Sequence, residues 1–289
     1  MLGLCNLLPL FYGELLSNLW TLPYKKSGRL GMIGQIWPIC HVNSTKRAGR
    51  TVKPSYADVT MQDFITEPGT ISNEFVHQSH QLGHLLYWHK HGKISIQVRQ
   101  EKSLRWLLIN DTLQSVIELN HPEKLLFPHL QVLAALWQKC PAPGKVLELG
   151  LGAGAIRDYL HISYPDCQIT SIDNNPDIIH CYKRYFGGDP ISNVSCSDAY
   201  QALENNGHYD WIILDLFSQL DAPRFLYEHK FYTQIRATLN EGGRLYINFL
   251  AEHDSQLKQL EHLLITNFGK KPFVHKVPDY ANHIISLTR

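Results

Sequence analysis

A strand-like run that leads directly into three glycines constrains the fold of this chain more than any other feature. Residues 146–149 (VLEL) are followed by Gly150, Gly152 and Gly154, and a helical spacing of apolar residues begins at Ala155. Glycines let the backbone turn sharply and approach a ligand closely, and the free N–H groups at a helix start favour polar or anionic atoms. The segment therefore predicts a strand, a ligand-binding turn and a helix in that order.

The region after Gly144 alternates short apolar runs with helical spacings. The expected strands are 145–149, 168–172, 194–196, 209–214, 244–249, 273–276 and 283–287, and the expected helices are 155–162, 176–186, 200–204, 225–239 and 255–268. Strands separated by such helices form right-handed crossovers and a parallel sheet that is covered on both faces. The fold class is therefore predicted as α/β, with a Rossmann-like domain of seven strands whose last pair forms an antiparallel edge.

The region before the glycines has a different pattern. Short β-rich runs at 85–88, 94–98, 106–109 and 115–117 are separated by turn formers, which predicts a small N-terminal antiparallel β-domain. A helix is expected in 123–139 after Pro128. The predicted domains are 1–75, an extension of uncertain structure, 76–122, the small β-hairpin domain, and 123–289, the Rossmann-like domain. Residues 1–60 show no amphipathic period and are expected to be dispensable for the fold.

Composition and charge exclude several classes of function. Hydrophobic residues make up 44% and charged residues 18% of the 289 residues, as in globular proteins. A formal net charge of +1 is too balanced for a nucleic-acid footprint, and residues 1–22 are too interrupted to be a signal peptide or to span a bilayer. Six scattered cysteines without a CxxC pair indicate reduced thiols. We expect no nucleic-acid or membrane partner and a cytoplasmic location.

Histidines gather at the start of the β-rich region. The cluster consists of His77, His80, His84, His89 and His91. A solvated polar stretch explains it, because no cysteine and no clear ligand geometry accompany the histidines. No metal site is assigned.

Asp173 ends the run 168–172, nineteen residues after the last glycine of the loop. A carboxylate there can accept hydrogen bonds from both hydroxyls of a ribose, so Asp173 and the adjacent Asn174 predict a site for an adenosine cofactor. The spacing also suits a dinucleotide, because Gly150, Gly152 and Ala155 fit the GxGxxA fingerprint. The glycine loop alone leaves both cofactors open.

Two further carboxylates follow expected strands. Asp198 comes after the run 194–196, where it can accept the adenine amino proton, and Ala199 lies beside it. Asp215 ends the run 209–214, at the edge where open α/β sheets bind ligands. We assign Asp215 as the candidate active-site acid, with a helix N-cap or turn residue as the alternative.

Together these segments resemble class I methyltransferases, and among them the spermidine synthase (polyamine aminopropyltransferase) family. The run 105–114 (RWLLINDTLQ) is similar to the family's strand and turn ending in LDGxxQ, so Gln114 matches its cofactor-binding glutamine. His129 falls near the family's cofactor-contacting histidine. The resemblance covers about residues 84–289 and implies S-adenosylmethionine or decarboxylated S-adenosylmethionine as the cofactor.

The chain departs from this family at acidic positions. Ala153 stands where the family's GGGDG loop has an aspartate, and Ser218 stands where its DxxDP motif has the second acid. Those family carboxylates hold amino groups, and a dication binds poorly where opposing charges are absent. Glu148 resembles the acid that methyltransferases commonly have near the charged tail of the cofactor. These departures favour intact S-adenosylmethionine over a polyamine synthase reaction.

The predicted function is a spermidine synthase-like transferase, most simply a methyltransferase on a small acceptor. The acceptor attacks the carbon next to the sulfonium, and Asp215 steers or deprotonates an amine. Aminopropyl transfer from decarboxylated S-adenosylmethionine, a non-catalytic cofactor-binding protein and a nicotinamide dehydrogenase remain as alternatives. The expected partner is a small-molecule acceptor, with an amine as one candidate, and a homodimer is left open.

Overall fold

The computed structural model of this chain describes residues 64–289 except 67–68, 188–192, 205–206, 217–222 and 252. All described residues belong to one unit of the chain, 37–289. The expected dispensability of residues 1–60 and the comparison at Ser218 lie outside the described residues.

Four antiparallel strands form the small sheet that the β-rich pattern predicted. They are β3 (His84–His91), β4 (Ile94–Glu101), β5 (Leu104–Ile109) and β6 (Thr112–Glu118), and they pair in this order. Asn110 and Asp111 join β5 to β6 with φ of 48° and 62°. Asparagine and aspartate tolerate this left-handed conformation, which tight hairpin turns require.

Three short elements precede this sheet and cover one of its faces: β1 (Ile65–Thr66), β2 (Thr70–Ile71) and α1 (Asn73–Gln78). Phe75 of α1 packs edge-to-face on Trp106 of β5, with ring centroids 5.1 Å apart. The Trp106 indole Nε1 donates to the Ser79 carbonyl at 3.0 Å, and both rings are fully buried. All three elements begin within the range 1–75, where no element was predicted because such short runs carry no readable period.

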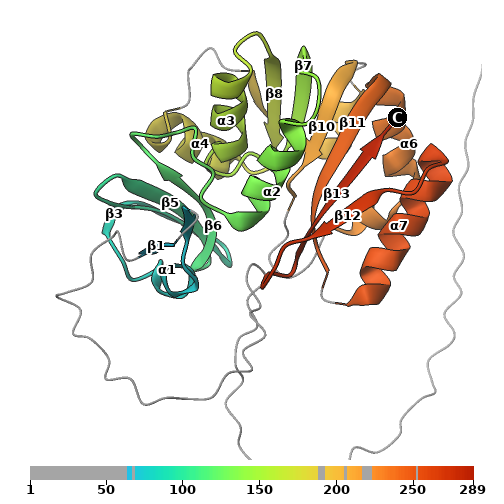
Figure 1. Ribbon diagram of the computed structural model, residues 1–289. Coiled ribbons are helices and arrows are strands. Elements are labelled where there is room, and N and C mark those ends of the chain that lie inside the picture. Colours follow the sequence, from blue (N-terminus) through green and yellow to red (C-terminus); the bar gives the residue numbers. More distant parts are fainter. Residues whose placement is uncertain (1–63, 67–68, 188–192, 205–206, 217–222, 252) are drawn as a thin grey trace, which may run out of the picture. The chain divides into compact units, whose positions relative to one another are not determined.

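The second sheet has seven strands and forms the centre of the Rossmann-like domain (Figure 1). The strands are β7 (Lys145–Leu149), β8 (Gln168–Asp173), β9 (Val194–Cys196), β10 (Tyr209–Leu214), β11 (Leu239–Leu250), β12 (Phe273–Lys276) and β13 (Asn282–Thr288), in the order β12-β13-β11-β10-β7-β8-β9. β13 is antiparallel to β11 and β12, and the other neighbours are parallel. The predicted seven-stranded sheet with an antiparallel pair at one edge is confirmed. From β7 the chain continues to β8 and β9 on one side and then crosses back to β10 on the other side of β7. This change of direction opens a ligand crevice at the carboxyl ends of these strands.

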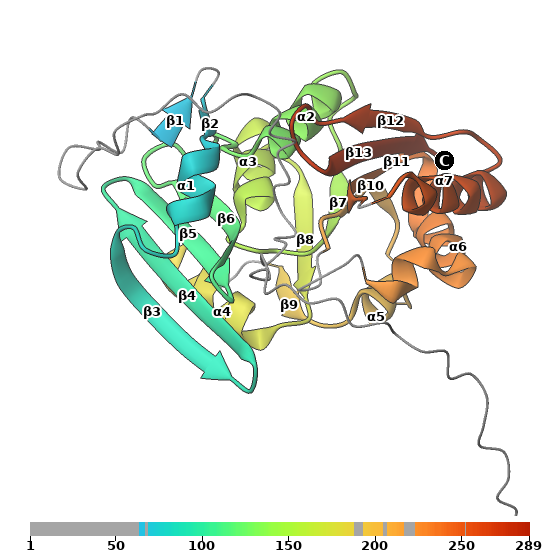
Figure 2. The ribbon, with the colours of Figure 1, turned by 90° about the horizontal axis from the view of Figure 1, so that it is seen from below.

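Helices cover both faces of this sheet (Figures 1 and 2). α2 (Pro128–Trp137), α3 (Ala155–Ser163) and α4 (Pro176–Tyr185) lie on one face, and α5 (Ala199–Glu204), α6 (His229–Thr238) and α7 (Asp254–Phe268) lie on the other. Each face of the sheet has its own hydrophobic core. Consecutive strand residues point to opposite faces, so Ile213 of β10 lies in the core beneath α2, α3 and α4, and Ile212 lies in the core beneath α5, α6 and α7. The small sheet contributes residues such as Leu107 to the core beneath α2, α3 and α4. None of the described helices is both long and apolar enough to cross a membrane.

The predicted helix 225–239 and the predicted strand 244–249 differ most from the structure. The segment 225–239 divides into a 3-10 turn, η2 (Arg224–Tyr227), and α6, because Glu228 between them is extended, with φ −101° and ψ 128°. β11 begins at Leu239 rather than at residue 244, and its pairing with β10 contains a register shift. The register shift is a bulge between Leu239 and Arg244, and Gly242, with φ 76°, lies within it. The glycines that indicated a break in the sequence therefore belong to a bulge inside a longer strand.

Candidate active site

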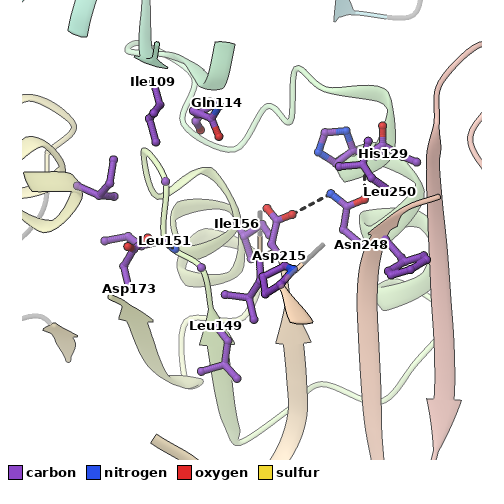
Figure 3. Close-up of a pocket in the computed structure, with 18 of the residues that line it drawn as sticks. Ile109, Gln114, His129, Leu149, Leu151, Ile156, Asp173, Asp215, Asn248 and Leu250 are labelled. Atoms are coloured by element: carbon purple, nitrogen blue, oxygen red, sulfur yellow. Dashed lines mark hydrogen bonds between the residues drawn. The ribbon is translucent and has the colours of Figure 1, made fainter. Parts of the chain in front are cut away.

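A cavity of about 990 Å³ opens at the carboxyl ends of β7, β8 and β10. The β5–β6 hairpin of the small sheet faces the glycine loop across it (Figure 3). The predicted site residues that line the cavity are Gln114, His129, Gly150, Gly152, Asp173, Asn174, Asp198, Ala199 and Asp215. Glu148 and Gly154 do not line it. Among the described residues, no group of three or more histidine, cysteine, aspartate or glutamate side chains has the arrangement to hold a metal ion.

The glycine loop is a tight turn with left-handed backbone at each predicted glycine. Gly150, Gly152 and Gly154 have φ of 97°, 54° and 82°. A Cβ on Gly150 would overlap the backbone carbonyl of Asp215, so only glycine lets the loop approach β10 this closely. Gly154 precedes α3 as its N-cap and packs against the ring of Tyr182. It therefore shapes the turn without lining the cavity.

Asp173 ends β8 beside the glycine loop (Figure 3). Its Oδ2 accepts a hydrogen bond from the Leu151 N–H at 3.2 Å, and its Oδ1 accepts one from the Asn175 N–H at 2.9 Å. Burial raises the pKa of this carboxyl, and the backbone N–H groups oppose the shift. Each oxygen keeps capacity for a further hydrogen bond. The geometry thus suits the expected binding of two ribose hydroxyls, with Asn174 on the same wall.

We expect Asp173→Ala to weaken binding of an adenosine cofactor by about 2 kcal/mol, roughly 30-fold in Kd, the scale of losing charge-assisted hydrogen bonds. Calorimetric titration with S-adenosylmethionine and its decarboxylated form measures the effect. Asp177→Ala, on α4 outside the cavity lining, is the control. A folded Asp173→Ala protein that binds with wild-type affinity would contradict the assignment.

Asp198 and Ala199 lie where α5 begins, in the same cavity. Asp198 Oδ1 accepts a hydrogen bond from the Tyr200 N–H at 2.8 Å, which caps the helix. Its second carboxylate oxygen has no hydrogen bond to the described residues and is available for an N–H donor such as the adenine amino group. Ala199 is buried and lines the cavity beside Asp198.

Gln114 and His129 lie across the cavity from the glycine loop (Figure 3). Gln114 lies on β6, and its Nε2 donates to the Thr112 carbonyl at 3.4 Å. His129 lies in the first turn of α2 and stacks on Phe127, with ring centroids 5.1 Å apart. Burial lowers the pKa of His129 to about 3. The ring is therefore neutral at neutral pH and has one donor and one acceptor nitrogen.

Asp215 directly follows β10 and is a partly buried acid of the cavity wall. Its N–H donates to the Leu149 carbonyl at 2.9 Å, which fixes the residue beside β7. Its Oδ1 accepts a hydrogen bond from Asn248 Nδ2 at 2.8 Å (Figure 3). Burial raises the pKa of Asp215 to about 6, against the opposing effect of the Asn248 hydrogen bond. A carboxylate with this pKa is ionised at neutral pH and basic enough to take up a proton.

Glu148 lies outside the cavity, which corrects its assignment as a cofactor-binding residue. It is 1% exposed on β7, and the Ser171 hydroxyl donates to its carboxyl. Arg157 Nη1 donates to the same hydroxyl at 3.0 Å. Glu148 thus points to the face of the sheet that α3 covers, whereas the cavity lies beyond the strand ends. Ala153 is also fully buried and does not line the cavity.

Glu148 has a consequence for stability. Burial raises its pKa to about 8, whereas an unfolded glutamate ionises near 4.5. Between these values the folded protein holds a proton that the unfolded chain has released, so the free energy of unfolding falls as pH rises. We expect Glu148→Gln to remove about 3 kcal/mol of this fall between pH 5.5 and pH 8, at about 1.4 kcal/mol per pH unit. Urea unfolding at both pH values measures this change in the free energy of unfolding. The substitution Glu241→Gln, at an exposed glutamate, is the control. Equal pH dependence in wild type and Glu148→Gln would contradict the account.

Asn248 and Asn282 are cavity residues that the sequence did not single out. Asn248 lies in β11 and Asn282 begins β13, with exposed fractions of 2% and 1%. Asn282 Nδ2 donates to Asn248 Oδ1 at 2.9 Å. The available signal was the amide in the otherwise apolar run 245–250, because a buried amide needs a hydrogen-bond partner.

The fold and the cavity define a protein of the Rossmann-like methyltransferase class, with a glycine loop and strand-end carboxylates arranged around a site for a nucleoside. Residues 115–281 match the family model described as the methyltransferase small domain. The chain belongs to this family, and within the class I S-adenosylmethionine-dependent proteins it is similar to the spermidine synthases.

Similar proteins include polyamine aminopropyltransferases. The one from Vibrio vulnificus is 27% identical over 172 residues, 57% of this chain and 57% of that protein, so the match spans little more than half of that relative. The one from Neisseria meningitidis serogroup A is 24% identical over 187 residues, 63% of this chain and 71% of that protein. A probable spermidine synthase structure from Corynebacterium glutamicum has a TM-score of 0.62 at 18% identity, covering 72% of this chain and 80% of that chain. The structural likeness shows the fold.

Proposed function

We propose that this protein transfers an aminopropyl group from decarboxylated S-adenosylmethionine to a small amine acceptor. The observation that carries the proposal is the charge of the cavity. Among the described lining residues, Asp173, Asp198, Asp215 and Asp254 stand against one lysine, Lys276. The decarboxylated cofactor carries a sulfonium and an ammonium but no carboxylate, and an acidic cavity favours this cation over a ligand with a carboxylate.

Two further findings support aminopropyl transfer over the methyl transfer that the sequence favoured. The matched relatives in Vibrio and Neisseria are named polyamine aminopropyltransferases. Glu148, which argued for intact S-adenosylmethionine, does not line the cavity and is 1% exposed. This weakens the argument from Glu148 for the intact cofactor.

The described residues suit an adenosine cofactor of this kind. Asp173 has hydrogen-bonding capacity for the ribose, and one oxygen of Asp198 has no hydrogen bond to the described residues and can accept from the adenine amino group. Gln114 and His129 face Asp173 from the other side of the cavity. Holding both reactants between these walls raises their effective concentration, which is the main source of rate when the reacting carbon is already activated.

Asp215 receives the proton in this mechanism. When bound, the decarboxylated cofactor supplies an activated carbon next to its sulfonium. As the acceptor nitrogen bonds to that carbon, the carbon–sulfur bond breaks and its electron pair stays on sulfur, so the nucleoside leaves as a neutral thioether. The surplus proton on the nitrogen passes to the Asp215 carboxylate, whose pKa of about 6 suits a general base near neutral pH.

Methyl transfer from intact S-adenosylmethionine is the second candidate. Lys276 lines the cavity and could pair with the carboxylate of the intact cofactor. Ala153 also stands where the resembled family has an acid for the cofactor amino group. The single lysine and the missing acid weigh less than the four cavity aspartates and the named relatives, so methyl transfer ranks second.

Calorimetry with the two cofactors tests the proposal. We expect decarboxylated S-adenosylmethionine to bind about 10-fold more tightly than S-adenosylmethionine, a difference of about 1.4 kcal/mol. Lys276→Met should widen the gap, because it removes the only described cavity lysine that can pair with a carboxylate. Tighter binding of the intact cofactor by the wild-type protein would favour methyl transfer instead.

A further inference from the structure

A chain of two buried amides extends from the active-site acid into the last strand. Asn248 Nδ2 donates to Asp215 Oδ1 at 2.8 Å, and Asn282 Nδ2 donates to Asn248 Oδ1 at 2.9 Å. Asn248 and Asn282 are almost fully buried, and both line the cavity. The chain thus links β10, β11 and β13 at one wall of the site.

The charge of Asp215 fixes the direction of every hydrogen bond in this chain. An ionised carboxylate can only accept, so the amide of Asn248 must present its NH2 group to Asp215. Its oxygen then faces Asn282, which must donate in turn. The carbonyl oxygen of Asn282 then stands at the end of this series of hydrogen bonds.

This carbonyl oxygen, Asn282 Oδ1, is buried and has no hydrogen-bond partner in the described structure. A buried acceptor without a partner destabilises the folded protein, and native proteins rarely leave one unpaired. Because Asn282 lines the cavity, the missing partner is best explained as a donor that arrives with a ligand.

We infer that Asn282 is a specificity-determining residue that binds the acceptor substrate through Oδ1, by accepting a hydrogen bond from one of its N–H groups. The inference rests on the proposed function. It also narrows the acceptor class, because Asp215 and Asn282 both line the cavity and both carry acceptor oxygens. A molecule with several N–H donors, such as a primary amine or a diamine, satisfies both. A carboxylate acceptor, which has only lone pairs, would face repulsion from both.

Calorimetry on a non-reacting complex tests the inference. The protein is saturated with 5′-methylthioadenosine, which lacks the sulfonium and cannot react, and is then titrated with putrescine. We expect Asn282→Ala to weaken putrescine binding about 10-fold while the affinity for 5′-methylthioadenosine stays within about 2-fold of wild type. Asn282→Thr is the second variant, because its hydroxyl can still donate to Asn248 but no acceptor reaches the position of Oδ1.

Asn267→Ala is the matched control. Asn267 is a buried asparagine of α7 that accepts from Thr233 and donates to the Leu263 carbonyl, and it does not line the cavity. Its loss should lower the melting temperature and leave putrescine affinity unchanged. The same pattern in both Asn282 variants would give Asn282 a structural role and overturn the inference alone. A wild-type complex that does not bind putrescine would overturn the proposed amine acceptor, and this inference with it.

Discussion

Asp215→Asn is expected to lower kcat for aminopropyl transfer about 1,000-fold, the middle of the range for losing a general base. Asparagine keeps the shape of the side chain and a hydrogen bond to Asn248 but cannot take up the proton of the acceptor amine. The affinity for the neutral product 5′-methylthioadenosine should change little, because Asp173 and Asp198, the residues proposed to hold the nucleoside, lie at other parts of the cavity wall. Steady-state kinetics with decarboxylated S-adenosylmethionine and putrescine measure the loss.

The pH dependence of kcat/KM tests independently whether Asp215 is the general base. The carboxylate of Asp215 is the active form, so wild-type kcat/KM should fall as the pH drops through about 6 and level off above it. In Asp215→Asn this limb should disappear. Asp210→Asn, at the other end of β10 and outside the cavity lining, is the control. Wild-type activity in Asp215→Asn would remove Asp215 from the mechanism.

Gly150→Ala is expected to destroy cofactor binding and to lower the free energy of unfolding by on the order of 4 kcal/mol. The added Cβ would meet the backbone carbonyl of Asp215 at a residue with φ of 97°, so the glycine loop must move away from β10. Denaturant unfolding and calorimetry measure the two effects.

Gly92→Ala separates strain from steric overlap. Gly92 also has positive φ, 59°, but nothing lies within 4 Å of an added Cβ. Its substitution should cost only the backbone strain, about 1 kcal/mol, and leave cofactor binding intact. Equal losses in the two variants would show that overlap with Asp215 is not what makes Gly150 necessary.

Local sequence signals predicted most of the fold, because most helices and strands have a readable spacing of apolar residues and end at turn-forming residues. Strands β7, β10 and β12 have the predicted bounds, and the antiparallel pair at the sheet edge was expected. Elements without a local signal were missed, such as β1 and β2, which are two residues each. The early start of β11 was hidden because the glycines 242–243 indicate a turn, whereas pairing with β10 at Leu239 and again from Arg244 includes them in the strand.

Most of the candidate site could be predicted because the carboxyl ends of parallel strands meet at one edge. This rule brought Asp173, Asp198 and Asp215 into one cavity. It failed for Glu148, because an acid inside a strand reaches one face of the sheet rather than its edge. The pairing of Asn248 with Asn282 could not be predicted, since it depends on the antiparallel register of β11 and β13.

The identity of the nucleoside product tests the central claim most directly. The wild-type protein is incubated with equal amounts of S-adenosylmethionine and decarboxylated S-adenosylmethionine in the presence of putrescine, and the products are separated by liquid chromatography with mass detection. Aminopropyl transfer predicts 5′-methylthioadenosine together with an aminopropylated amine, both lost in Asp215→Asn. Formation of S-adenosylhomocysteine with a methylated acceptor, and no 5′-methylthioadenosine above the level without protein, would contradict it.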